Sequence, residues 1–201
     1  MKILALDSSG LVASVAVVEN DTLLAEYTVN YKKTHSQTLL PMLDEISNMT
    51  ELDLSTIDAI AVAGGPGSFT GLRIGSATAK GLGLALEKPL ISIPTTAAIA
   101  YNIWDTDKFV CPIMDARRNQ VYTGVYCYTD HRLDTVWEQD TMSIEALAEG
   151  LNCLDHEVIF LGDGVAVYRE KLEALLTIPF SFAPARALLP SESYLLCNKP
   201  Q

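Results

Sequence analysis

The first residues that could do chemistry are an aspartate and two serines at the end of an apolar run. Asp7 ends the run KILALD, and Ser8, Ser9 and a glycine precede the next apolar run. A carboxylate in this position could hold magnesium, and the amides of the turn could meet phosphate groups. An aspartate that only closes a hairpin explains the same residues, so both interpretations stay open.

A second group of polar residues follows a later apolar run, in the segment MDARRNQVY at residues 114–122. Asp115 and Arg117 in this segment could face a cleft, although a solvated β-turn is the commoner use of such residues. Farther along the chain, Gly162 and Gly164 could lie behind an adenine ring. A glycine turn between a strand and a helix explains these two residues equally well.

The glycine-rich stretch GGPGSFTGLRIGSATAKGLGLAL, residues 64–86, first suggests a phosphate-binding loop. A Walker loop needs the pattern G-x-x-x-x-G-K-[ST], but Phe69 and Thr70 stand where its second glycine would be. A dinucleotide-binding fingerprint also fails at Thr70. A nucleophile elbow would need glycine in place of Pro66 and Thr70, so we interpret Ser68 as a helix cap.

Small residues recur at every fourth position of this stretch and would form one stripe along a helix. We name them the small-residue ridge: Gly67, Gly71, Gly75, Ala79 and Gly83. Small side chains allow another backbone to approach closely. The remaining residues are apolar on nearly all sides of the helix, so the helix must be covered on nearly all sides. Neighbouring helices of the same domain, or a second protein chain, could cover it.

The histidines and cysteines predict neither a metal site nor a catalytic centre. His35, His131 and His156 are far apart and form no H-x-x-x-H pair. The 4 cysteines form no C-x-x-C pair, which is typical of reduced thiols in the cytoplasm. We therefore assign no catalytic residue and no metal ligand.

The elements that would position these residues are strands alternating with helices. Three β-rich runs predict an antiparallel meander, which a helix, a strand, a helix, a strand and a helix follow. This order is typical of an RNase H-like unit. Thr34 has capping-box spacing to Gln37, but Pro41 means that the first helix either kinks or begins later. The predicted bounds are 2–7, 12–18 and 22–29 for the meander and 69–86 for the glycine-rich helix.

The composition turns polar around NIWDTDKF, so we place a domain boundary there. The first domain would be residues 1–104 and the second residues 105–201. The second half begins again with three strand-like segments, and a short helix, a buried strand and a further helix follow. This order resembles a shortened second copy of the same unit. The predicted fold is therefore α/β, with two lobes and a cleft between them.

The chain is acidic, with a formal net charge of −11 at pH 7. Residues 1–104 contain 6 basic and 10 acidic side chains, and the rest contains 8 and 15. Because nucleic-acid binding normally needs a basic face, we expect no tight direct binding of RNA or DNA. The first apolar run is too short for a secretion signal, and no apolar stretch could cross a bilayer. We therefore expect a cytoplasmic protein with no membrane contact.

Three segments in this order, ILALDSS, GGPGSFTGLRIG and MDARRNQVY, with HSQTLLPML between the first two, strongly resemble the TsaB (YeaZ) family. The resemblance covers residues 1–125 well and the rest loosely. It implies two RNase H-like lobes of the actin/Hsp70-like ATPase (ASKHA) superfamily. The family is required for threonylcarbamoyladenosine modification of adenosine 37 in tRNA, and is often labelled an M22 glycoprotease homologue.

The resemblance further implies a noncatalytic subunit that forms a heterodimer with the catalytic paralogue TsaD, with the ATPase TsaE in a ternary complex. The same face would form a homodimer when the chain is alone, and a partner would hold the tRNA. TsaD-type metal binding uses an H-x-x-x-H helix, which this chain lacks. The predicted partner face consists of the small-residue ridge with Leu72, and of residues 34–46 with Leu39 and Leu43.

An alternative hypothesis is an active enzyme of the same fold, either an ATP-dependent phosphotransferase or an M22-type glycoprotease. It would need a metal ion or a catalytic base, for which Asp7 and Asp115 are the candidates, with ATP and magnesium as candidate cofactors. The chain ends after ALLPSESYLLCNKPQ, where relatives generally continue with a further helix. This difference predicts an altered end of the second lobe.

Overall fold

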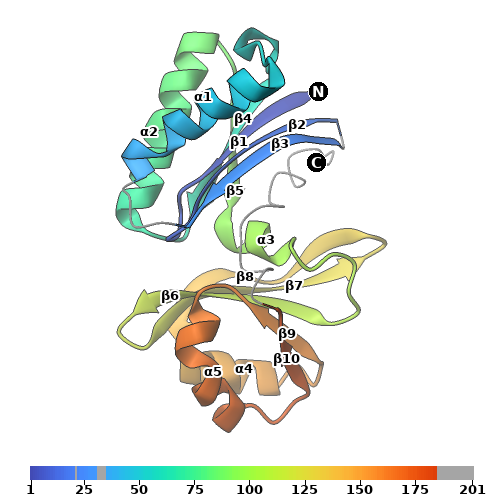
Figure 1. Cartoon of the computed structure of the whole chain (residues 1–201). Coiled ribbons are helices and arrows are strands. Elements are labelled where there is room, and N and C mark those ends of the chain that lie inside the picture. The colour runs from blue at the N-terminus through green and yellow to red at the C-terminus, as the bar shows by residue number, and fades with distance from the viewer. Residues whose placement is uncertain (21, 31–34, 185–201) are drawn as a thin grey trace. The chain divides into compact units, whose positions relative to one another are not determined.

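The computed structural model describes residues 1–20, 22–30 and 35–184, which form two compact units (Figure 1). The first unit is Met1–Ala98, and the second begins at Ile99. The boundary predicted after Trp104 lies a few residues farther along the chain. Thr34 and the predicted altered end of the second lobe lie outside the described residues.

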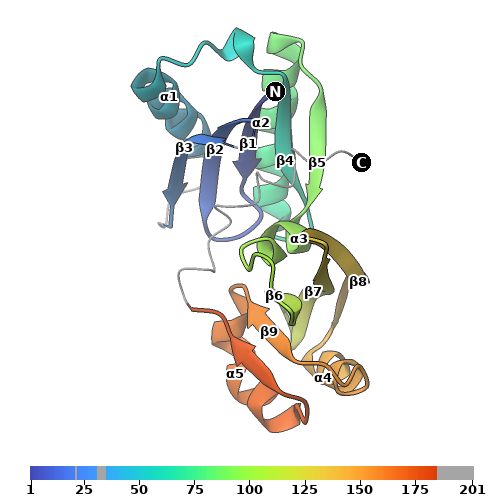
Figure 2. The ribbon, with the colours of Figure 1, turned by 90° about the vertical axis from the view of Figure 1, so that its right-hand side faces the viewer.

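The first unit is built on a sheet whose strands lie in the order β3-β2-β1-β4-β5 (Figure 2). The predicted antiparallel meander is confirmed, because β2 pairs with both β1 and β3 in that sense. The next two strands extend the sheet in parallel, since helices connect them. The bounds are β1 (Lys2–Asp7), β2 (Ala13–Glu19), β3 (Thr22–Val29), β4 (Ala59–Gly65) and β5 (Leu90–Pro94).

Two helices, α1 (Leu39–Thr50) and α2 (Phe69–Leu86), lie side by side on one face of this sheet (Figure 1). They bury apolar side chains against the strands, and each fully buried leucine or isoleucine contributes about 1.5–3 kcal/mol. This core includes Leu4, Val15, Leu39, Leu43, Ile46 and Ile60. Short 3₁₀ turns lie at His35–Gln37 (η1) and Leu54–Thr56 (η2).

The first helix begins later than the capping-box pattern suggests. It starts at Leu39, after the turn η1, so Pro41 is the third helical residue. The first amides of a helix have no partner within the helix, so a proline there removes no hydrogen bond. A late start, and not a kink, is therefore how the helix accommodates Pro41.

The second unit repeats the topology of the first, as the sequence predicts. Its meander is β6 (Phe109–Arg117), β7 (Gln120–Thr129) and β8 (Arg132–Ser143), and β9 (Val158–Leu161) and β10 (Phe180–Phe182) run parallel to β6. The strand order is β10-β9-β6-β7-β8, so the first strand is again central. The three-residue strand β10 was not predicted, because it is too short to show a period.

Helices α4 (Ile144–Asn152) and α5 (Gly164–Leu175) pack on the sheet of the second unit. Phe160 and Leu147 lie in the centre of this core and are fully buried. The hydroxyl of Ser143 caps α4 by accepting a hydrogen bond from the amide of Ala146 at 3.1 Å. Helix α3 (Thr95–Ala100) is short and follows β5 directly.

No helix among the described residues is long and apolar enough to cross a membrane.

Candidate functional site

Four residues of the small-residue ridge lie on α2 and Gly67 lies in the turn before it, and the ridge faces the strands and turns of its own unit. A Cβ atom on Gly71 would lie 2.0 Å from the carbonyl oxygen of Ser8, and one on Gly67 would lie 2.4 Å from that of Ser9. A Cβ atom on Gly75 would lie 2.5 Å from the hydroxyl oxygen of Ser8. Contacts this short leave no room for a side chain, so the glycines are needed for packing within the unit.

This packing corrects the predicted partner face. The groove along Gly67, Gly71, Gly75, Ala79 and Gly83 is filled by the chain's own backbone and side chains, and all of these except the half-buried Gly67 are buried. Leu39 and Leu43 are also buried, in the core beneath α1. Spacing alone shows that one side of a helix is small, but not whether the neighbour belongs to the same chain.

The opposite side of α2 is exposed and carries a different set of residues. Phe69 and Leu84 are 68% and 83% exposed, although both are large and apolar. Arg73 and Lys80 lie between them, and α2 contains no acidic residue. These residues recur at helical spacing along one stripe, which we name the outer stripe of α2. The guanidinium of Arg73 lies over the ring of Phe69, 3.9 Å from its centre.

A groove of about 640 Å³ lies between the outer stripe and the neighbouring strands β4 and β5. Strand β5 is at the edge of the sheet, and its Leu90 and Ser92 are exposed at the groove. Leu72, from the predicted partner face, is half-buried and lines the same groove. An apolar groove with two cationic side chains, on an acidic chain, suits a partner that brings apolar and acidic side chains.

The turn after β1 is occupied by contacts within the unit. The amide of Ser9 donates to Asp7 Oδ1 at 2.7 Å, and the hydroxyl of Ser8 donates to the carbonyl of Gly71 at 2.9 Å. The carbonyl of Ser9 accepts a hydrogen bond from the amide of Ser68 at 2.6 Å. The Ser9 amide and the Ser8 hydroxyl would be the natural donors to a phosphate. Since both are already used, this turn does not fit a phosphate cradle.

Asp7 itself is buried, at 6% exposure. Burial raises the pKa of its carboxyl group, and the hydrogen bonds from Ser9 and the charge of His35 oppose this rise. His35 Nε2 donates to the carbonyl of Gly10 at 2.9 Å, which ties the turn to η1. The environment of Asp7 is therefore that of a buried structural carboxylate.

The candidate residues of the second unit lie where β6 and β9 end. Cβ atoms on Gly162 and Gly164 would lie 2.3 and 2.9 Å from the carbonyl oxygen of Ile113, so both glycines allow two backbones to approach closely. The amide of Asp115 donates to Asp163 Oδ1 at 3.2 Å. Burial, and then the charge of Asp115, raise the pKa of Asp163. Arg117 is exposed at the end of β6.

Metal-ligating side chains do not gather in the part of the chain that the structure describes: no group of three or more histidines, cysteines, aspartates or glutamates could hold an ion there. The outer stripe of α2 is thus the strongest candidate functional site. None of its four residues, Phe69, Arg73, Lys80 and Leu84, was predicted as a site residue from the sequence. The available signal was that Arg73 and Lys80, the charges of the helix, are seven residues apart and so share a face.

Comparison with known proteins shows close relatives along most of the chain. Residues 22–192 match the family model of TsaD, tRNA N6-adenosine threonylcarbamoyltransferase. The tRNA threonylcarbamoyladenosine biosynthesis protein TsaB of Bacillus subtilis (strain 168) is 35% identical, over 88% of this chain and 77% of the relative. TsaB of Escherichia coli (strain K12) is 32% identical, over 82% of this chain and 72% of the relative.

Solved structures agree with these relatives. YeaZ from Pseudomonas aeruginosa matches with a TM-score of 0.80 at 29% identity, over 98% of this chain and 89% of that protein. An ROK hexokinase from Thermus thermophilus matches with a TM-score of 0.53 at 14% identity, over 97% of this chain and 98% of that protein. The hexokinase shares the fold alone, and this likeness confirms the predicted actin-like ATPase fold.

Proposed function

Since the chain belongs to the TsaB family of tRNA threonylcarbamoyladenosine biosynthesis proteins, we propose that it acts in this modification of tRNA as a noncatalytic subunit bound to TsaD. The match to the TsaD family model supports a shared ancestry of the two subunits. We place the complex in the cytoplasm, where tRNA is modified. The outer stripe of α2 would be the surface that binds TsaD.

The exposure of large apolar residues on α2 carries this proposal. Phe69 and Leu84 would remain in contact with water in an isolated chain, at an energetic cost that a partner removes. The groove beside them adds a concave surface, which Leu72 and Leu90 line. Anchoring residues of protein interfaces are usually aromatic, apolar or arginine side chains of this kind.

Charge adds selectivity to this surface. Arg73 and Lys80 have no ion pair among the described residues, and the chain as a whole is acidic. An acidic face on TsaD would therefore be attracted to α2 and repelled by the rest of the surface. The same stripe could pair with α2 of a second copy, but two rows of Arg73 and Lys80 would then repel each other. We therefore expect the homodimer to be weaker than the heterodimer. In the proposed complex, TsaE joins the heterodimer.

The test uses substitutions that change the outer stripe without changing the core. Arg73→Glu and Leu84→Asp should each raise the Kd for TsaD by about tenfold or more, because both residues lie in the proposed contact. Val167→Asp in α5 is the matched control, since Val167 is 58% exposed and lies in the second unit. It should change the Kd by less than about twofold.

Binding would be measured by isothermal titration calorimetry, and folding of each variant by circular dichroism. A modification assay with tRNA, TsaD and TsaE should lose activity in the same variants. If Arg73→Glu and Leu84→Asp bind TsaD as tightly as the unchanged chain does, the outer stripe is not the TsaD contact. If the unchanged chain does not bind TsaD, the proposed function itself is wrong.

A further inference from the structure

The turn between β6 and β7 has an unusual backbone. Arg117, Arg118 and Asn119 follow one another with φ angles of 66°, 52° and 63°, which is the left-handed region. Residues with a Cβ atom rarely adopt this conformation, and three in succession cost conformational free energy. Surrounding contacts must therefore hold the turn in this shape. We name Arg117 and Arg118 the arginine tip.

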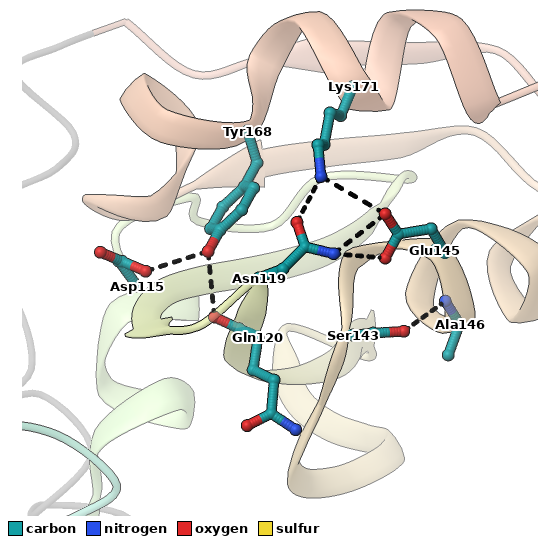
Figure 3. Close-up of polar contacts among 8 residues, drawn as sticks. All are labelled: Asp115, Asn119, Gln120, Ser143, Glu145, Ala146, Tyr168 and Lys171. Carbon is teal, nitrogen blue, oxygen red and sulfur yellow. Dashed lines mark hydrogen bonds and ion pairs between the residues drawn. The ribbon is translucent and has the colours of Figure 1, made fainter.

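One set of contacts holds the turn from the side of α5 (Figure 3). The hydroxyl of Tyr168 donates to Asp115 Oδ1 at 3.0 Å and lies 3.3 Å from the carbonyl oxygen of Gln120. The same Asp115 oxygen accepts a hydrogen bond from the amide of Arg117 at 2.8 Å. Tyr168 therefore links the residues on both sides of the arginine tip to one helix.

A second set of contacts holds Asn119 (Figure 3). Its Nδ2 donates to both carboxylate oxygens of Glu145 in α4, at 3.0 and 2.7 Å. Lys171 in α5 donates to Asn119 Oδ1 and lies 3.4 Å from Glu145. The hydrogen bond from Asn119, and then the backbone amide of Glu145 itself, lower the pKa of Glu145, and the contacts with Lys171 lower it further. Three side chains from two helices and the turn thus form one network.

The network does not use the charges of the arginine tip. Both residues are exposed, and neither guanidinium has an ion pair or hydrogen bond with a described residue. In the same unit, Lys108 pairs with Glu157 at 2.5 Å, and Arg169 lies over the ring of Phe182. A strained turn is thus held by its neighbours, while its two arginines are left available.

We propose that the arginine tip binds carboxylate side chains of an acidic segment in a partner protein of the modification complex, an inference that rests on the proposed function. The planar guanidinium of arginine binds carboxylates through two parallel hydrogen bonds. A rigid turn loses little conformational entropy on binding. A tRNA backbone fits less well, because nucleic-acid binding normally needs a broad basic face, and the chain as a whole has a net charge of −11.

The experiment reverses the charge of the tip. The double variant Arg117→Glu/Arg118→Glu should raise the Kd of the full chain for TsaD, or for TsaD with TsaE, by about tenfold or more, with a weaker salt dependence. Arg132→Glu is the matched control, because Arg132 is also exposed and lies at the next hairpin, and it should change the Kd by less than about twofold. Thermal unfolding of each variant checks folding.

Tyr168→Phe tests whether the network positions the tip. It keeps the aromatic ring but removes the hydroxyl contacts, so binding should weaken by about two- to fivefold and the salt dependence should stay unchanged. The inference would be overturned if the double variant and Arg132→Glu had equal Kd values, both for TsaD and for TsaD with TsaE. The proposed function would then remain intact. Loss of tRNA binding with unchanged protein assembly would overturn the inference in favour of RNA. A chain that binds neither TsaD nor TsaE overturns both proposals.

Discussion

The backbone of Gly71 in α2 lies so close to Ser8 that a Cβ atom at residue 71 would be 2.0 Å from the Ser8 carbonyl oxygen. The Ser8 hydroxyl also donates to the Gly71 carbonyl at 2.9 Å. Helix α2 is thus fixed to the turn after β1 through backbone atoms that cannot move aside as a flexible side chain could. This contact turns the ridge inward and leaves the outer stripe of α2 exposed.

Gly71→Ala should therefore destabilise the first unit. Relief of the contact requires the helix or the turn to shift, which we expect to cost about 1–3 kcal/mol in the free energy of unfolding. Gly81→Ala in the same helix is the control, because nothing lies within 4 Å of a Cβ atom there. It should stabilise the chain by about 0.5–1 kcal/mol. Urea unfolding followed by circular dichroism would separate the two, and equal stabilities would contradict the packing argument.

Asp7 should make stability depend on pH. Its pKa is raised above the ordinary value of 3.8, mainly by burial, so the folded state binds the proton more tightly than the unfolded state. The contribution of Asp7 to the free energy of unfolding is therefore greatest below pH 3.8 and falls until the pH passes its folded-state pKa. Asp7→Asn removes this contribution and should give a flatter profile.

Urea unfolding of the unchanged chain and of Asp7→Asn at a series of pH values measures that difference. Asp53→Asn provides a control of opposite sign, because the hydrogen bonds from Ser55 lower the pKa of Asp53. Its contribution to stability is present above the ordinary pKa and is lost as the pH falls. Parallel profiles for Asp7→Asn and the unchanged chain would show that Asp7 ionises as freely in the folded state as in the unfolded one.

The cysteines should differ sharply in reactivity. Burial raises the pKa of Cys111 to about 12, whereas Cys153 is exposed. Since the thiolate is the reactive form, iodoacetamide at about pH 8 should label Cys153 in the folded chain and leave Cys111 unlabelled until urea is added. Peptide mass spectrometry of the folded and unfolded chain reads this directly. Early labelling of Cys111 would mean that the core of the second unit opens.

The parts of the fold that could be predicted are those with a local pattern. Apolar runs separated by short turns predicted the meander of β1, β2 and β3, and Ser68 with a small-residue repeat predicted α2 to its exact bounds. Strand β10 was missed because Phe180–Phe182 is held by its pairing with β9, a contact between distant residues. The start of α1 could not be predicted, because a kink and a later start would both accommodate Pro41.

The orientation of α2 could not be predicted for a related reason. Its two stripes are both visible in the sequence, and hydrophobicity alone would turn Phe69 and Leu84 toward the sheet. Steric fit determines the opposite orientation, because only the glycine side of α2 can approach the Ser8 carbonyl. The exposed apolar stripe, which is the candidate site, is therefore a consequence of a tertiary contact.

A last prediction concerns the junction of β4 and α3. The hydroxyl of Thr95, which is fully buried, accepts a hydrogen bond from the amide of Gly65 at 3.2 Å. Thr95→Val keeps the shape but leaves that buried amide without its acceptor, which should cost about 1–3 kcal/mol. Thr95→Ser keeps the acceptor and loses one methyl group, at about 0.8 kcal/mol.

The free energy of unfolding in urea should therefore be lower for Thr95→Val than for Thr95→Ser. Hydrogen exchange at the Gly65 amide should accelerate only in Thr95→Val. The opposite ranking would mean that packing of the Thr95 methyl group, and not its hydrogen bond, holds this junction. Because Gly65 immediately precedes the turn into α2, a loosened amide there should also weaken TsaD binding if the outer stripe is the contact. The serine variant should bind TsaD as the unchanged chain does.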